Sequence, residues 1–165
     1  MLLLKNLLFT VIVPGTVALW VPLLLLGRDR TPATGVVRGL ALVGLATGAL
    51  IYAWCVWDFA TFGHGTPAPI DAPKRLVVRG VYRVSRNPMY VGVLSVIVGW
   101  ALLFRSPGLA VYAFAVWSCF QSFVVFYEEP HLRRTFGAEY EGYCASVGRW
   151  LPRPGGGARR ARSAP

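Results

Sequence analysis

The sequence predicts an all-α integral membrane protein with about four transmembrane helices, the third and fourth forming a helical hairpin, and a C-terminal interfacial amphipathic helix. Hydrophobic residues make up 55% of the 165 residues and charged residues only 15%, whereas globular chains carry about 25% charged residues. The mean hydropathy is +0.52. The chain is too short for a large soluble core beside a membrane part, so we expect one membrane domain over 1–151 and a disordered basic tail over 152–165.

The first two apolar runs are each long enough to cross a bilayer. Residues 1–26 exceed a hydrocarbon core of about 30 Å at about 1.5 Å per residue, although two prolines lie among them. We expect a retained, tilted or kinked helix, with a cleaved signal peptide as the alternative. The second run, 36–57, contains Gly44 and Gly48, a small-residue face that allows another helix to approach closely.

A polar segment, 58–87, separates the second apolar run from the third. Its glycines and prolines oppose regular structure, and its cations collect toward its end: Lys74, Arg75, Arg79, Arg83 and Arg86. We expect an interfacial loop with a functional role, because its polar groups lead directly into the next apolar run.

Pro88 predicts the start of a third helix, since proline suits the first helical turn and disfavours helix in the residue before it. The apolar run continues to about residue 104, which barely crosses a bilayer. Gly92, Ser95 and Gly99 place small side chains on one face of this helix. A close helical partner is therefore expected there.

The third and fourth apolar runs are joined by a tight turn at 105–108, after which 109–127 returns without a charge. Such a helical hairpin brings Asn87 back to the same side of the membrane as Glu128 and Glu129. Beyond this pair, apolar residues recur at helical spacing and predict the amphipathic helix: Leu132, Phe136, Tyr140, Tyr143 and Val147.

The charge distribution predicts orientation and partners. Thirteen of the 17 lysines and arginines fall on the side that carries both termini, which the positive-inside rule places in the cytoplasm. The net charge of +10 arises from loops between apolar runs, so we expect contact with anionic membrane lipids and no nucleic-acid partner. The spacing of the cysteines and histidines indicates no metal site, and the small-residue faces imply no particular oligomeric state.

The adjacent carboxylates of Glu128 and Glu129 need a positive partner. The sequence places them at the C-terminal end of a membrane helix, where the helix dipole disfavours anions and each repels the other. Nearby arginines could compensate them as a purely structural cluster. A cytosolic ligand carrying an ammonium, ribose hydroxyls and a carboxylate would use groups of both signs, and S-adenosylmethionine has this set.

Four motifs resemble a known family by their order and spacing. RGVYRVSRNPMYVG, EEPHL, FGAEYEGY and VGRWLP, within residues 79–152, look like the C-terminal catalytic module of the isoprenylcysteine carboxyl methyltransferases, which belong with the membrane phospholipid methyltransferases. Members are integral membrane enzymes that methylate lipidated or lipid-like substrates with S-adenosylmethionine. The resemblance therefore implies that cofactor and a catalytic module at 79–152.

Carried over by position, the resemblance implies a set of site residues and no metal. The cofactor would be bound by Tyr82, Arg83, Asn87, Pro88, Tyr90, Gly92, Glu128 and Glu129, and the catalytic residues would be Arg86, Asn87 and Glu129. The family usually has histidine at the position of Asn87, and asparagine can hydrogen-bond but not titrate. It also has a basic residue before the glutamate pair, for which Arg133 or Arg134 is a candidate substitute here.

We therefore expect methyl transfer by in-line displacement to a lipophilic small molecule or lipidated substrate that enters from the bilayer. A carboxylate acceptor needs no base and an amine does, so the missing imidazole favours an oxygen or sulfur nucleophile. A non-catalytic membrane scaffold or partner subunit is the first alternative. A membrane NADPH-dependent reductase is the second, and it should need more cations and more spans.

Overall fold

The computed structural model describes residues 2–27, 31–63 and 76–153, with side chains described from residue 8 onward except those of 62 and 63. The helices are α1 (Leu2–Gly15), η1 (Thr16–Trp20), α2 (Val21–Leu26), α3 (Gly35–Asp58), η2 (Phe59–Gly63), η3 (Gly80–Arg83), α4 (Pro88–Leu103), α5 (Pro107–Phe123), η4 (Val124–Glu128), α6 (Glu129–Phe136) and α7 (Ala138–Ser146). Of these, η1, η2 and η4 are π-helical turns and η3 is a 3₁₀ turn. Extended pairing in the described part is limited to an isolated bridge between Ser85 and Gly148, so the predicted all-α class is confirmed.

Three helical segments are long and apolar enough to cross a membrane: Leu8–Leu26, Gly35–Thr61 and Pro107–Phe136. A fourth apolar helix, α4, has 16 residues and is about 24 Å long, which is less than a hydrocarbon core of about 30 Å. The protein is thus a helical membrane protein.

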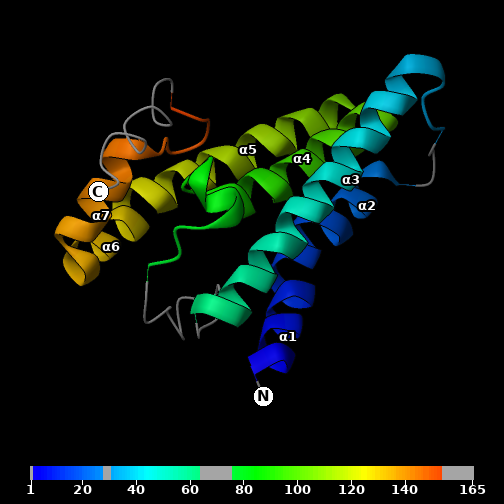
Figure 1. The fold of residues 1–165 in the computed structure, drawn as a ribbon. Coiled ribbons are helices and arrows are strands. Elements are labelled where there is room, and N and C mark those ends of the chain that lie inside the picture. Colours follow the sequence, from blue (N-terminus) through cyan, green and yellow to red (C-terminus); the bar gives the residue numbers. More distant parts are fainter. Residues whose placement is uncertain (1, 28–30, 64–75, 154–165) are drawn as a thin grey trace.

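The apolar helices pack against one another, and the most extensive contact is between α3 and α4 (Figure 1). At one end of the molecule, the Ala33 N–H donates to the carbonyl oxygen of Leu103 at 2.6 Å, so the segment before α3 lies beside the turn between α4 and α5. The opposite end carries η3, α6 and α7 (Figure 1). The polar segments that flank the apolar helices there are therefore brought together.

The predicted small-residue faces of α3 and α4 meet each other. A Cβ atom added to Gly48 would lie 2.6 Å from the Gly92 carbonyl oxygen, and one added to Gly92 would lie 2.8 Å from that of Gly48. A Cβ atom added to Gly99 would likewise lie 2.8 Å from Leu45 Cγ. The two backbones come this close only because glycine leaves the space open.

A π-helical turn and a proline remove the usual α-helical donors of two carbonyls in the N-terminal segment. Pro22 has no N–H to donate to the Ala18 carbonyl, and the Val21 N–H donates to Thr16 O instead of Val17 O. Both are satisfied from other helices: the Tyr112 hydroxyl donates to Val17 O at 2.9 Å and the Trp100 indole N–H donates to Ala18 O at 3.1 Å. Because an unpaired carbonyl is costly in lipid, these bonds fasten the N-terminal segment to α4 and α5.

The sequence suggested that the helix beginning at Pro107 ends before the glutamate pair, and this is wrong. The helix continues through η4 into α6 and stops at Gly137, which has a φ of 49°. The predicted amphipathic helix is therefore two helices, α6 and α7, broken where glycine adopts a left-handed conformation. Its apolar residues still form one cluster: Leu132, Phe136, Tyr140, Tyr143 and Val147.

Parts of two predicted segments lie outside the described residues. These are the middle of the polar loop, 64–75, with Lys74 and Arg75, and residues 154–165 of the predicted tail. The first residues of that tail are attached, because Arg153 Nη1 donates to the carbonyl oxygens of Cys144 and Ala145 at 3.1 and 3.2 Å.

Candidate active site

The segment that leads into α4 is fixed between α3 and α7. Tyr82, on η3, is buried in a cluster with Cys55 and Val77, and its carbonyl accepts a 2.7 Å hydrogen bond from the Tyr143 hydroxyl. Burial raises the pKa of Tyr82 well above its usual value. Its phenol therefore stays protonated and can act as a hydrogen-bond donor.

Asn87 immediately precedes α4 and is held in one orientation. Its Nδ2 donates to the carbonyl oxygen of Arg149 at 3.1 Å, and its backbone N–H donates to Ser85 Oγ at 3.2 Å. The side chain is buried. The amide oxygen makes none of these bonds, so it is an acceptor that Asn87 can offer to a ligand.

Glu129 lies in a buried ion cluster with two arginines. Arg86 Nη1 is 3.1 Å from Glu129 Oε1, and Arg149 binds the same carboxylate in a bidentate manner, with Nε at 2.7 Å from Oε1 and Nη2 at 3.0 Å from Oε2. The side chains of Arg86 and Glu129 are only 11% and 9% exposed. The hydrogen bond to Glu129 also raises the pKa of Arg149, so the cluster stays charged.

The neighbouring Glu128 has a different environment. The Tyr90 hydroxyl donates to its Oε2 at 3.0 Å, and none of the ion pairs among the described residues includes Glu128. Tyr90 is itself packed against Phe120 with ring centroids 4.6 Å apart. Glu128 is thus a partly buried carboxylate whose negative charge has no cationic partner in the described chain.

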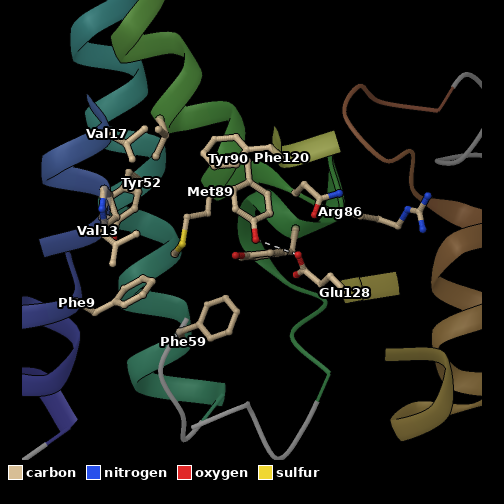
Figure 2. Close-up of a pocket in the computed structure, with 14 residues that line it drawn as sticks. Phe9, Val13, Val17, Tyr52, Phe59, Arg86, Met89, Tyr90, Phe120 and Glu128 are labelled. Carbon is tan, nitrogen blue, oxygen red and sulfur yellow. Dashed lines mark hydrogen bonds between the residues drawn. The ribbon is translucent and has the colours of Figure 1, made fainter. Parts of the chain in front are cut away.

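A cavity of about 130 Å³ lies among α1, α3, α4 and the α5–η4 helix (Figure 2). Its polar lining is Tyr52, Tyr82, Arg86, Asn87, Tyr90 and Glu128, and its apolar lining is Phe9, Val13, Pro14, Val17, Phe59, Met89, Val93 and Phe120. In Figure 2, Arg86, Tyr90 and Glu128 lie across the cavity from Phe9, Val13 and Val17.

Five of the predicted site residues line this cavity: Tyr82, Arg86, Asn87, Tyr90 and Glu128. The other four lie elsewhere. Arg83 is exposed and Pro88 is buried at the first turn of α4, Gly92 contacts α3, and Glu129 belongs to the ion cluster.

The main site residue that sequence reasoning missed is Arg149. Arg133, one of the candidate substitutes, pairs instead with Glu141 on α7, and the cations beside Glu129 come from Arg86 and Arg149. The position of Arg149 within the VGRWLP motif and the absence of a cation before the glutamate pair were the two signals that could have identified it.

The polar lining offers groups of both kinds to a ligand. Glu128 and the amide oxygen of Asn87 are acceptors, whereas Arg86 Nε is a buried donor without a hydrogen-bond partner. Buried polar groups are normally paired, so this arrangement suits a ligand with a cationic group and an acceptor group. The amino-acid part of S-adenosylmethionine has both. Among the described residues, no group of histidine, cysteine and acidic side chains is placed to hold a metal ion.

Comparison with known proteins identifies the family of the chain. The chain matches the family described as phospholipid methyltransferase over residues 36–139. It is 40% identical over 93 residues to protein-S-isoprenylcysteine O-methyltransferase A of Arabidopsis thaliana, covering 56% of this chain and 47% of that protein. To the protein-S-isoprenylcysteine O-methyltransferase of Saccharomyces cerevisiae it is 34% identical over 93 residues, which cover 56% and 38% of the two chains.

The name of a third relative indicates a different acceptor. Phosphatidylethanolamine N-methyltransferase of Yarrowia lipolytica is 35% identical over 69 residues, covering 41% of this chain and 7% of that protein. No solved structure matches the chain, and the matched region spans about half the length of the first curated relatives. Since the family match covers most of the chain, including α3, α4, α5 and the glutamate pair, the protein belongs to the phospholipid methyltransferase family.

Proposed function

We propose that the protein is a membrane methyltransferase that transfers a methyl group from S-adenosylmethionine to a lipophilic acceptor. The observation that carries this proposal is the position of Glu128, a carboxylate without a cationic partner beside a mostly apolar cavity. A positively charged methyl donor satisfies that carboxylate, and the apolar lining accepts a lipophilic partner.

The side chains around the cavity have distinct roles in this proposal. The cofactor supplies a methyl group on a positively charged sulfur. Glu128, fixed by Tyr90, attracts positive charge, and the Asn87 amide oxygen accepts a hydrogen bond. Arg86 donates to a carboxylate through Nε, while Glu129 and Arg149 hold Arg86 in place. The protein thereby contributes position and exclusion of water, which are the main requirements of an in-line displacement.

The membrane arrangement is part of the same proposal. α4, although short, would be a fourth span that forms a hairpin with the helix from Pro107, and α6 and α7 would lie at the interface. Both termini and the polar end of the cavity would face the cytoplasm, in agreement with the distribution of lysine and arginine. The catalytic module would comprise 79–152 within a single domain, 1–151.

The acceptor would be an isoprenylcysteine-like carboxylate or another lipid-like nucleophile with oxygen, sulfur or nitrogen. The names of the relatives include both an O-methyltransferase and an N-methyltransferase. Asn87 does not titrate, so an amine acceptor would need another base, and Glu128 is the carboxylate closest to the cavity.

The test is Glu128→Gln, with cofactor binding measured by calorimetry in detergent. We expect the variant to lose binding of S-adenosylmethionine while its circular dichroism spectrum stays unchanged. Glu139→Gln is the matched control, because Glu139 is exposed on α7 and the variant should bind normally. Unchanged binding by Glu128→Gln would remove Glu128 from the site and favour the non-catalytic scaffold.

A further inference from the structure

The N-terminal helix forms one wall of the cavity although it lies outside the family match, which begins at residue 36. Phe9, Val13 and Val17 line the cavity and are spaced four residues apart, so they share one face of the helix. Figure 2 shows all three directed toward the cavity from the same helix. The N-terminal helix therefore lines the site although it lies outside the region that matches the family.

This wall is held in place by hydrogen bonds within the apolar region. Thr10 Oγ1 and Tyr52 Oη are 3.0 Å apart. At the end of the wall marked by Val17, Tyr112 and Trp100 donate to the carbonyl oxygens of Val17 and Ala18. The helix therefore has a defined position against the cavity rather than a loose contact with it.

The wall contributes apolar side chains, whereas Arg86, Asn87 and Glu128 line the cavity from other elements. On the opposite face of the helix, Val11 is 56% exposed, as expected for a side chain that faces lipid. Val13 is 47% exposed and also lines the cavity. Val13 therefore lies at the edge between the cavity and the surrounding bilayer.

We propose that the N-terminal helix, α1 with its continuation η1, is the specificity-determining wall of the site and that Phe9, Val13 and Val17 contact the apolar chain of the acceptor. This inference rests on the proposed methyltransferase function. The cavity, at about 130 Å³, is comparable to an engineered protein cavity of about 150 Å³ that holds benzene. Space of this size admits only part of a lipid chain, so the bulk of the side chains on this N-terminal helix sets which chains enter.

The test compares Val13→Trp with Val11→Trp, the same substitution on opposite faces of one helix. Methyl transfer is measured with N-acetylcysteines that carry S-prenyl, S-geranyl or S-farnesyl chains, and cofactor binding is measured by calorimetry. We expect Val13→Trp to lower kcat/KM for the farnesyl acceptor by about tenfold or more and to affect the prenyl acceptor less. Val11→Trp should match the unmodified protein with every acceptor, and cofactor affinity should be unchanged in both variants.

Equal behaviour of the two tryptophan variants would overturn the inference while leaving the proposed function intact. If Val13→Trp does not fold, Val13→Ala decides: it should shift preference toward the farnesyl acceptor, and an unchanged preference would contradict the inference.

A crosslinking experiment separates the two proposals. A farnesyl analogue with a diazirine at the chain end is activated in the detergent-solubilised protein, and the labelled peptide is identified by mass spectrometry. Label on residues 8–17 supports the inference that the N-terminal helix contacts the acceptor chain. If the protein then neither binds S-adenosylmethionine nor transfers a methyl group, only the proposed function is refuted. Label confined to other helices would overturn the inference.

Discussion

Neutralising the two adjacent glutamates one at a time should change the stability of the protein by different amounts. Glu129→Gln leaves Arg86 and Arg149 without their shared anion, whereas Glu128→Gln removes a charge that has no cationic partner and retains an acceptor for Tyr90. We expect Glu129→Gln to destabilise the fold and Glu128→Gln to leave stability nearly unchanged.

The size of the effect follows from burial. Breaking a buried ion pair costs about 3 to 5 kcal/mol when a charge is left uncompensated. Arg86 is 11% exposed and cannot be rehydrated easily, but Arg149 is 32% exposed and can recover water. The lower end, about 3 kcal/mol, is therefore expected for Glu129→Gln, which lowers Tm by roughly 6 to 12 °C for a chain of this size. For Glu128→Gln we expect a change below about 1 kcal/mol.

The assay is thermal unfolding in one detergent, followed by tryptophan fluorescence, for the two variants and for Glu141→Gln. Glu141 pairs with Arg133 on the surface, where both side chains are about half exposed, and such pairs contribute about 0 to 1 kcal/mol. Equal shifts in Tm for the two variants of the pair, or a larger shift for Glu128→Gln, would refute the different roles that we assign to Glu128 and Glu129.

Two glycine substitutions test close contacts of the fold. Gly48→Ala places a Cβ 2.6 Å from a carbonyl oxygen of α4 and should destabilise the protein by about 1 to 3 kcal/mol through overpacking, whereas Gly39→Ala, with nothing within 4 Å, should not. Gly80→Ala places a Cβ 2.5 Å from Asp58 Oδ2 and should lower Tm more than Gly137→Ala, because both positions have positive φ but only the first lacks space. Thermal unfolding checks both pairs, and equal Tm values within either pair would contradict the contact that it tests.

The parts of the structure that local sequence determines could be predicted. Long apolar runs specify the membrane helices, and Pro88 marks the start of α4 because its ring favours the first turn. Small residues at helical spacing also predicted a close approach at Gly48 and at Gly92, although not that these two faces meet each other. In each case the signal lies within one helix or one turn.

The contacts that complete the site join residues far apart in sequence. The Arg149 side chain binds Glu129 and its carbonyl oxygen binds Asn87, 62 positions earlier. The N-terminal helix is held beside the cavity by Tyr112 and Trp100, which donate to carbonyl oxygens of η1. The spacing of apolar residues does not indicate which distant polar residues pair. Sequence reasoning could therefore place Arg149 in a motif but could not identify Glu129 as its partner.

The position at which the fourth apolar helix ends decides which partners Glu128 and Glu129 can reach. If the helix ended before residue 128, both carboxylates could turn toward one ligand. Because the helix continues to Phe136, consecutive side chains point about 100° apart. Glu128 therefore reaches Tyr90 and the cavity, while Glu129 reaches Arg86 and Arg149. The continuous backbone gives two neighbouring and chemically identical residues different partners, one facing a ligand and the other fixing the arginine that lines the same cavity.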